Sequence, residues 1–256
     1  MSEHLTALIT ALGYGAFKVG RNQKTKYGHS YELPTEQESD RLLNSVLDLG
    51  ITVIDTAPSY GLSEERIGRY LSHRREEFFL STKAGETFEG ESRYDYSKDA
   101  IVASVHSSLQ RLRTDVLDCV FVHSHSDDVA VLTETDAVET LLDLKAKGLT
   151  KLVGFSGYSC LAIRNSLPQV DAIMVEFNVN NTTHAGVMRE AAERGVKVFV
   201  KKGMASGSVP AQQAIPFVLQ NTSVTTLLLS SLSVEHLKEN IWRTSDGGGK
   251  EITRIA

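Results

Sequence analysis

Eight short apolar runs, separated by amphipathic stretches, constrain the fold of this chain more than any other feature. Runs that are apolar on both faces and joined by helical stretches indicate a parallel sheet, because each parallel connection needs a crossover. Eight such units in 256 residues predict a closed (β/α)₈ TIM barrel that forms a single domain over residues 1–256. The runs cover residues 11–17, 51–55, 78–83, 116–123, 151–156, 172–178, 196–202 and 224–230.

The stretches between the runs carry helix signals. Thr35 and Glu38 form a capping-box pattern, and apolar residues at core-facing spacing follow them. Gly50 and two later glycines stand where a helix would end shortly before the next run. The alternative fold, an open doubly wound sheet, calls for a GxGxxG turn after its first strand. Gly13 and Gly15 are followed by Ala-Phe-Lys, so that fingerprint is absent.

Composition narrows the partners and the compartment. The net charge is −5 and no block of basic residues occurs, which argues against nucleic-acid and anionic-membrane partners. The two cysteines lie outside any CxxC spacing, and Cys119 sits in an apolar run as expected of a buried free thiol. The first residues lack a signal-peptide pattern, and no apolar stretch is long enough to span a membrane. We therefore expect a cytoplasmic protein with a flexible tail over residues 244–256; the sequence leaves its oligomeric state open.

The second, third and fourth apolar runs end in titratable residues, namely Asp55, Lys83 and His123. Tyr60 follows Asp55 by five residues. Taken singly, each has an ordinary explanation as a helix cap, a packing aromatic or a solvated loop residue. In a parallel barrel, however, the carboxyl ends of all strands meet at one face, where reactive side chains lie. We expect the four residues to share one site.

The four side chains together suit the reduction of a carbonyl group. A lysine ammonium beside a tyrosine hydroxyl favours the phenolate and should lower the phenol pKa toward neutrality. A carboxylate paired with that lysine keeps it charged and in place. The tyrosine can then protonate the carbonyl oxygen as hydride reaches the carbon, while the imidazole orients or polarises the same carbonyl.

The sequence resembles the aldo-keto reductase family over nearly the whole chain. The stretch DTAPSYGLSEERIG, which begins at Asp55, is the most specific match, and LDCVFVH, which ends at His123, is moderately specific. The resemblance implies a barrel that reduces small-molecule aldehydes or ketones with NADPH or NADH and has no Rossmann domain. It also implies a catalytic tetrad of Asp55, Tyr60, Lys83 and His123, with Tyr60 as the general acid.

The resemblance further implies where the cofactor lies. Ser156 occupies the place of a serine that contacts the nicotinamide carboxamide, and the helix after Ser233 offers free amides to a phosphate. Ser230 and His236 stand where NADPH-preferring members carry lysine and arginine. NADP(H) is therefore the expected cofactor and NAD(H) an alternative. The expected cofactor-binding set is Ser156, Lys201, Lys202, Ser230, Ser231, Ser233, His236, Glu239 and Asn240.

Other interpretations of the same residues stay open. Lys201 and Lys202 either bind the pyrophosphate as point charges or are solvated residues of the rim. A metal site is not expected, because the pair His123 and His125 has no matching ligands at later run ends. A cofactor-binding regulatory protein with little turnover is one functional alternative. A Schiff-base aldolase that uses Lys83 or Lys201 is another.

Overall fold

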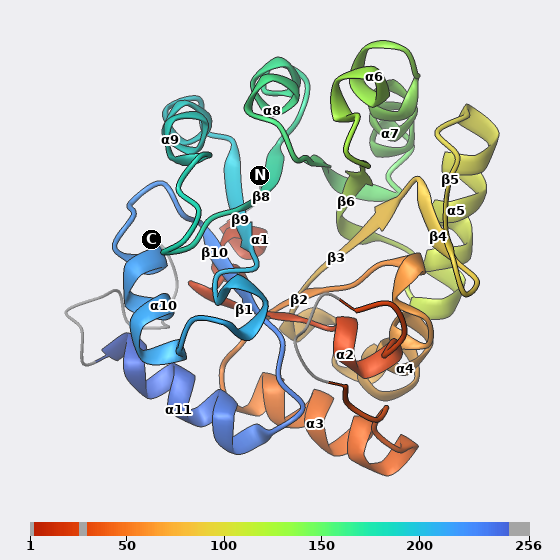
Figure 1. The fold of residues 1–256 in the computed structure, drawn as a ribbon. Coiled ribbons are helices and arrows are strands. Elements are labelled where there is room, and N and C mark those ends of the chain that lie inside the picture. Colours follow the sequence, from red (N-terminus) through yellow and green to blue (C-terminus); the bar gives the residue numbers. More distant parts are fainter. Residues whose placement is uncertain (1–2, 26–29, 246–256) are drawn as a thin grey trace.

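The eight predicted runs form a closed parallel barrel in the computed structural model, which describes residues 3–25 and 30–245. Neighbouring strands follow chain order, and the last strand pairs with the first to close the barrel (Figure 1). The predicted TIM barrel is confirmed. Its strands are β1 (Leu12–Gly15), β2 (Val53–Asp55), β3 (Phe79–Ala84), β6 (Leu117–His123), β7 (Thr150–Ser156), β8 (Ala172–Glu176), β9 (Lys197–Lys201) and β10 (Thr226–Leu229).

Helices surround the barrel and cover its outer face (Figure 1). Thr35 caps the first of them through the predicted capping box, in which its hydroxyl accepts from the Glu38 amide and the Glu38 carboxylate accepts from the Thr35 amide. Gly50 follows that helix with φ +81°, a conformation that glycine adopts without strain. The outer helices are α3 (Glu36–Asp48), α4 (Ser63–Leu71), α5 (Lys98–Leu112), α7 (Ala137–Ala146), α8 (Cys160–Ser166), α9 (Ala185–Glu193), α10 (Ala211–Leu219) and α11 (Val234–Ser245).

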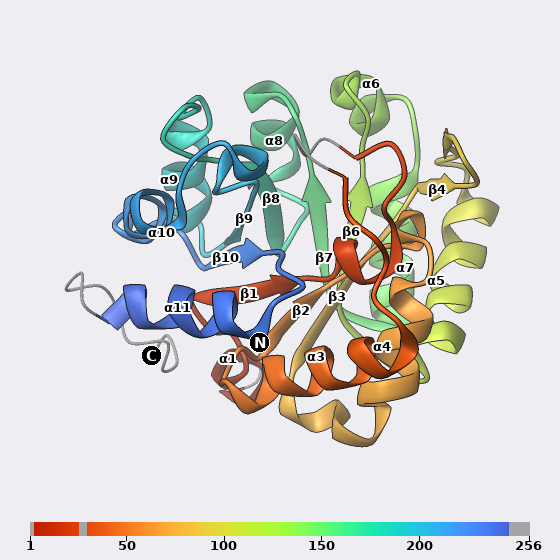
Figure 2. The same ribbon diagram turned by 60° about the horizontal axis from the view of Figure 1, so that its bottom comes forward.

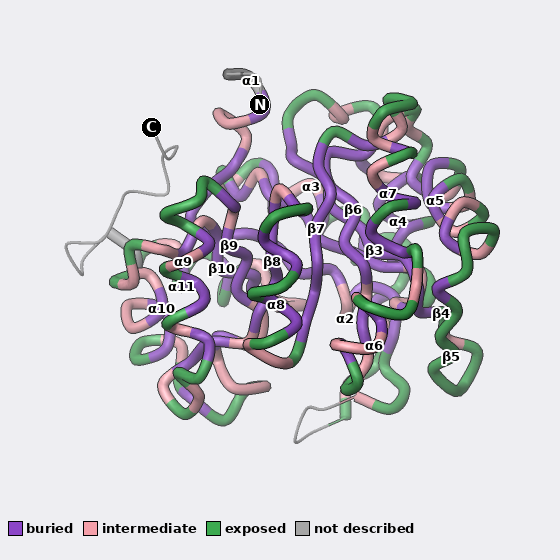
Figure 3. The backbone as a smooth tube through the Cα atoms, turned by 90° about the horizontal axis from the view of Figure 1, so that it is seen from above, coloured by how far each residue is buried: buried purple, intermediate pink, exposed green. Residues whose placement is uncertain are grey.

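Two apolar layers hold these elements together. One layer fills the barrel interior with side chains such as Phe79, Phe121 and Phe199, and the other lies between the strands and the helices. Cys119 belongs to the inner layer, where burial raises the pKa of its thiol well above the ordinary value. Figure 3 shows the strands of the barrel largely buried, as expected of a sheet covered on both faces.

The two ends of the barrel differ. The short helix α1 (Glu3–Ala7) brings Leu5 against the inner layer, and Ile9 follows it there, so apolar side chains close the amino-terminal end. Figure 2 shows α1 at the end opposite to the one toward which the strand arrows of β6, β7 and β8 point. The carboxyl ends of the strands therefore face the remaining open end.

Several short elements were not predicted. The hairpin of β4 (Glu86–Phe88) and β5 (Ser92–Tyr94) extends the chain beyond β3, and η1 (Pro58–Tyr60) is a 3₁₀ turn that follows β2. Their three-residue length leaves too few positions for an apolar period to be visible in the sequence. The others are α2 (Phe17–Gly20), η2 (Ser72–Glu77), α6 (Asp128–Thr133) and η3 (Ala205–Gly207).

The sequence predicts a flexible carboxyl-terminal tail and no membrane-spanning segment. Of the tail predicted to be flexible, residues 246–256 lie outside the described residues. Within the part of the chain that the structure describes, no helix combines the length and the apolar character needed to cross a bilayer.

Asp118 ties the amino-terminal parts of three strands together. Its fully buried carboxylate pairs with Arg75 at 2.6 Å and with Lys151 at 2.8 Å, and it accepts the Leu80 amide at 2.8 Å. It lies at the other end of β6 from His123 and does not line the cavity at the carboxyl ends of the strands.

The Asp118→Ala variant should lower the free energy of unfolding by about 3 kcal/mol, because it leaves the buried Leu80 amide without its acceptor and the Arg75 guanidinium without its carboxylate partner. Urea unfolding followed by far-UV circular dichroism measures the change. Asp143→Ala is the matched control, since Asp143 pairs with Lys98 at 3.4 Å on the surface and should contribute at most about 1 kcal/mol. Equal losses in the two variants would contradict the structural role of Asp118.

Candidate active site

A cavity of about 340 Å³ opens at the carboxyl ends of the strands. All four residues of the expected tetrad line it, and they come from strand ends or the turn directly after them. The fold therefore brings together side chains that are up to 68 positions apart in the sequence. The residues that matter most for chemistry here are Asp55, Tyr60, Lys83, His123, Ser156 and Lys201.

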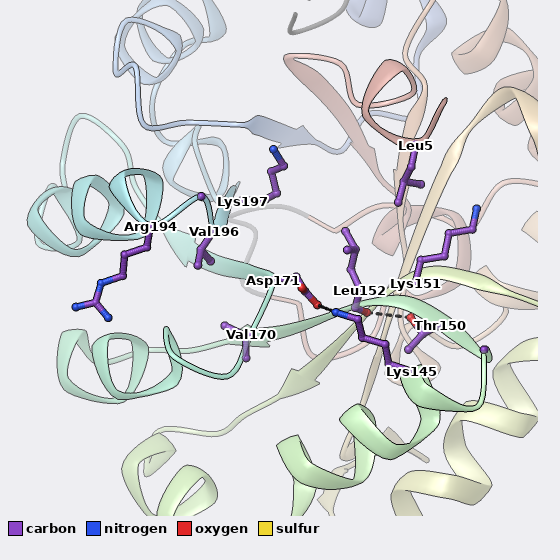
Figure 4. A pocket seen from close by; sticks show the side chains of 12 residues that line it. Leu5, Lys145, Thr150, Lys151, Leu152, Val170, Asp171, Arg194, Val196 and Lys197 are labelled. Carbon is purple, nitrogen blue, oxygen red and sulfur yellow. Dashed lines mark hydrogen bonds and ion pairs between the residues drawn. The ribbon is translucent and has the colours of Figure 1, made fainter. Parts of the chain in front are cut away.

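A second hollow, of about 750 Å³, lies at the opposite end of the barrel (Figure 4). Several cationic side chains line it, but Lys145 pairs with Asp171 at 2.6 Å, and Arg194 pairs with Glu190 at 2.7 Å. The amino-terminal face of this barrel type serves stability rather than catalysis. The candidate active site is therefore the smaller cavity at the carboxyl ends.

Asp55 and Lys83 form a buried ion pair at the base of the cavity. The Lys83 ammonium lies 2.6 Å from the Asp55 carboxylate and donates to the Thr56 carbonyl at 2.8 Å. Ser81 donates to the second Asp55 oxygen at 2.9 Å. Burial opposes the charge on Lys83, but Asp55 and Tyr60 outweigh it and raise the pKa of the ammonium above its usual value. Lys83 therefore stays charged.

Tyr60 ends the 3₁₀ turn η1 and lies over Lys83. The Lys83 nitrogen is 4.8 Å from the centroid of the Tyr60 ring, and Phe17 packs against the same ring edge-on at 5.0 Å. Burial and the negative charges of Asp55 and Glu86 together raise the pKa of the phenol to about 12. The positive charge of Lys83 acts in the opposite direction and offsets only part of this increase. The prediction that Lys83 brings this pKa toward neutrality is wrong. The phenol keeps its proton at neutral pH.

His123 has a carboxylate partner that the sequence did not reveal. Nδ1 of His123 lies 2.8 Å from Oε2 of Glu86, which also accepts from Ser59 at 3.0 Å. Tyr94 donates to the other oxygen of Glu86 at 3.3 Å. Glu86 is only 9% exposed and stands on β4, just past the end of β3. That position beyond a strand end was the one signal available in the sequence.

The charges of the Glu86–His123 pair follow from its surroundings. Burial works against the Glu86 carboxylate, but His123 and two serine hydroxyls lower its pKa to about 2. Burial, together with the charges of Lys83 and Lys201, lowers the pKa of His123 although Glu86 acts in the opposite direction. At neutral pH the pair is therefore a carboxylate beside a neutral imidazole. This assigns the proton to Nδ1 and leaves a lone pair on Nε2.

The expected cofactor-binding residues divide into two groups. Ser156, Lys201, Lys202 and Ser230 line the cavity. The Lys201 amine donates to Ser156 at 2.9 Å, whereas Lys202 pairs with Glu176 at 2.7 Å. The remaining five lie on α11 or in the segment before it and do not line the cavity: Ser231, Ser233, His236, Glu239 and Asn240.

The segment before α11 is ordered by serine hydroxyls. Ser233 caps the helix, since its hydroxyl accepts from the His236 amide at 3.2 Å. Ser231 in turn accepts from the Ser233 amide at 3.1 Å, and Ser230 donates to the Gly15 carbonyl at 2.7 Å. His236 and Glu239 are exposed, and Asn240 is buried. The predicted cap at Ser233 is confirmed.

The long motif after Asp55 is a packing motif that holds Tyr60 in place. Gly61 has φ +60°, and a Cβ there would lie 2.4 Å from the Gly20 carbonyl. Ser63 donates to the Ala16 carbonyl at 2.9 Å, and Glu64 pairs with Arg111 at 2.7 Å. A side chain at Gly68 would lie 2.0 Å from the Arg111 carbonyl. These contacts fix the turn between β2 and α4, and with it the position of the phenol.

Comparison with known proteins identifies the family of this chain. A family model described as the aldo/keto reductase family matches residues 11–213. D-arabinose 1-dehydrogenase of Saccharomyces cerevisiae is 37% identical over 51% of this chain and 43% of its own length. L-galactose dehydrogenase of Arabidopsis thaliana is 26% identical over 97% of this chain and 75% of its own length. The chain thus spans less than two thirds of the first of these relatives.

Solved structures of aldo-keto reductases share the fold of this chain. A Pseudomonas aeruginosa structure described as an aldo-keto reductase is 35% identical, covers 93% of this chain and 91% of its own, and superposes with a TM-score of 0.86. The holo form of an aldo-keto reductase from Bacillus halodurans, at 24% identity and a TM-score of 0.78, shows the shared fold. From its matched residues and its barrel, this chain belongs to the aldo/keto reductase family.

Proposed function

We propose that this protein interconverts carbonyl and alcohol groups of small hydroxylated molecules, with Tyr60 as the proton donor in reduction. The observation that carries the proposal is the Asp55–Lys83 ion pair beneath a protonated Tyr60 in the cavity at the carboxyl ends of the strands. A nicotinamide cofactor supplies or accepts hydride in this family. The protein's own residues supply the proton and hold the charge.

Tyr60 and Lys83 divide the work of proton delivery. The phenol holds its proton across the neutral range because burial has raised its pKa to about 12. As it gives that proton to the substrate oxygen, the phenolate left behind faces the permanent charge of Lys83. Asp55 keeps Lys83 charged and oriented. A positioned general acid of this kind contributes about 10²–10⁴ to the rate.

His123 has a different part from the one expected from the sequence. With the proton on Nδ1 beside Glu86, Nε2 accepts a hydrogen bond rather than donating one to a carbonyl. We propose that Nε2 accepts from a substrate hydroxyl, either the alcohol that is oxidised or a neighbouring one. Hydroxylated substrates also suit the polar groups of the cavity, which include Arg21, Ser59 and Tyr94. The similarity to two sugar dehydrogenases supports the same substrate class.

The residues along one side of the cavity fit a nicotinamide dinucleotide. Ser156 and Lys201 end β7 and β9, Met174 lies opposite Ser156 in the middle of β8, and Ser230 follows β10. They offer hydroxyls, an apolar surface and a cation in a row that leads toward the amino-terminal end of α11. There the first amides and the helix dipole favour a phosphate. We propose that this row holds the cofactor.

The Tyr60→Phe variant should retain cofactor affinity within about twofold and lose at least about 10²-fold in kcat for a hydroxyaldehyde, because it lacks only the transferable proton. Steady-state oxidation of NADPH measures kcat, and quenching of protein fluorescence measures binding. Activity equal to that of the natural protein would overturn the mechanism. Cofactor binding without turnover by the natural protein, across a broad carbonyl panel, would instead favour a regulatory role.

The Glu86→Gln variant should lower kcat/KM for alcohol oxidation by about 10–100-fold, because the amide no longer fixes the imidazole tautomer. Glu86 also raises the pKa of His123, so its removal should move the acid limb of the pH profile to lower pH. Glu89→Gln is the matched control, since Glu89 lies on the same hairpin loop but is exposed. An unshifted acid limb in Glu86→Gln would exclude the neutral His123 imidazole as the group that the acid limb reports.

NADPH and NADH should bind with dissociation constants within about tenfold of each other, because the two positions hold serine and histidine rather than lysine and arginine. Ser230 donates to the Gly15 carbonyl, and His236 is exposed. Titration of each nucleotide against protein fluorescence tests this. The His236→Arg variant should tighten NADPH binding and leave NADH unchanged, since a guanidinium pairs strongly with a 2′-phosphate. A preference for NADPH above about 100-fold in the natural protein would contradict the assignment of these positions, because that ratio corresponds to a full charge-assisted contact.

A further inference from the structure

One amine in the active-site cavity is left over by the proposed hydride and proton transfers. Four lysines line the cavity: Lys24, Lys83, Lys201 and Lys202. Lys83 and Lys202 each lie within 2.7 Å of a carboxylate, and Lys24 lies 3.5 Å from Glu91. Lys201 has no carboxylate within ion-pair distance among the described residues. Its ε-amine therefore lacks the partner that would keep it charged.

The Lys201 amine is held at a fixed place. It ends β9, donates one hydrogen bond to the Ser156 hydroxyl at 2.9 Å and lies 4.9 Å from the centroid of the Tyr158 ring. Serine and tyrosine carry no opposing charge at neutral pH. The side chain is anchored at the cavity wall by a neutral acceptor and an aromatic face.

The surroundings of Lys201 favour the neutral amine. Burial and the positive charges of Lys202 and Lys83 together lower the pKa of the Lys201 amine to about 7, although Asp55 and Glu176 act in the opposite direction. About half of the Lys201 side chains are therefore neutral near pH 7, whereas an ordinary lysine with a pKa near 10.4 is almost wholly protonated there. A neutral amine is the form that attacks carbonyl carbon.

We propose that Lys201 is a second reactive centre of this cavity, an amine that captures small aldehydes as reversible imines without any nicotinamide cofactor. The Lys201 nitrogen forms a bond to the aldehyde carbon, and the resulting carbinolamine loses its hydroxyl as water, so that a carbon–nitrogen double bond remains. No electrons are exchanged with a cofactor, and addition of water reverses the reaction. The water that leaves takes the carbinolamine hydroxyl and the hydrogen remaining on the Lys201 nitrogen.

The ligand class follows from the site. Hydroxyl and charged groups line the cavity of about 340 Å³ that holds the amine. A hydroxyaldehyde offers an aldehyde to Lys201 and hydroxyl groups to this polar wall. Ketones are disfavoured, because the second carbon substituent would compete for space with the Tyr158 ring beside the amine.

Reductive trapping tests the proposal on the full chain. The natural protein, free of nicotinamide nucleotide, is incubated at pH 7 with glycolaldehyde and sodium cyanoborohydride, which reduces the imine to a stable hydroxyethyl amine. Peptide mapping by mass spectrometry then gives the labelling rate of each lysine. We expect Lys201 to be labelled at least about tenfold faster than Lys202 and the exposed lysines, in line with its larger neutral fraction. Labelling of Lys201 at the rate of an exposed lysine would overturn the proposal.

Two substitutions at the neighbouring lysine test the cause of the reactivity. The Lys202→Arg variant keeps the neighbouring positive charge and should label Lys201 at the natural rate. The Lys202→Gln variant removes that charge and should slow the labelling of Lys201 severalfold at pH 7, because the amine becomes easier to protonate. Equal rates in the two variants would exclude Lys202 as the cause. In the Lys201→Arg variant the label at this position should disappear while labels elsewhere remain.

The outcome is independent of the proposed oxidoreductase function. The trapping assay contains no nicotinamide, so a protein that fails to turn over carbonyl substrates but labels at Lys201 would refute only the function proposed above. A protein that reduces aldehydes with NADPH but leaves Lys201 unlabelled would refute only this inference.

Discussion

The buried Asp55–Lys83 ion pair is the interaction on which the open end of the barrel depends. Burying these two opposite charges costs desolvation energy, which their attraction at 2.6 Å and the hydrogen bonds to Thr56 and Ser81 offset. Loss of either partner would leave an uncompensated charge in the core. The pair also sets the field felt by its neighbours, since the Lys83 charge acts on Tyr60, His123 and Lys201. The pKa values of the site are therefore coupled through one lysine.

At neutral pH the Tyr60 phenol is protonated and the His123 imidazole is neutral, so the site holds a hydrogen-bond donor and an acceptor together. Burial raises the pKa of Tyr60 so that its proton is retained, while His123 is kept neutral with a lone pair available. Environments that push neighbouring pKa values apart allow one site to hold a donor and an acceptor at the same pH. Glu86 completes this arrangement, because it fixes which nitrogen of His123 carries the hydrogen. The phenol that donates and the imidazole nitrogen that accepts a hydrogen bond then line the same cavity.

Sequence reasoning reached the fold and the four tetrad positions because both leave local signals. An apolar run and the residue that ends it are visible in the sequence, and parallel strands carry such residues to a common face, as with Asp55, Lys83 and His123. Glu86 left no comparable signal, since a three-residue strand shows no period. The phenol pKa of Tyr60 was misjudged because a single charged neighbour was weighed without the burial that outweighs it. Likewise, the missing partner of Lys201 is a property of packing across strands, which spacing along the chain does not express.

The apolar closure of the barrel by Leu5 and Ile9 has a kinetic consequence. The inner layer, in which Leu5 and Ile9 join Phe79, Phe121 and Phe199, leaves no passage through the barrel. Small molecules therefore reach and leave the carboxyl-end cavity from one side, so a molecule bound at its mouth slows the exchange of any molecule bound beneath it.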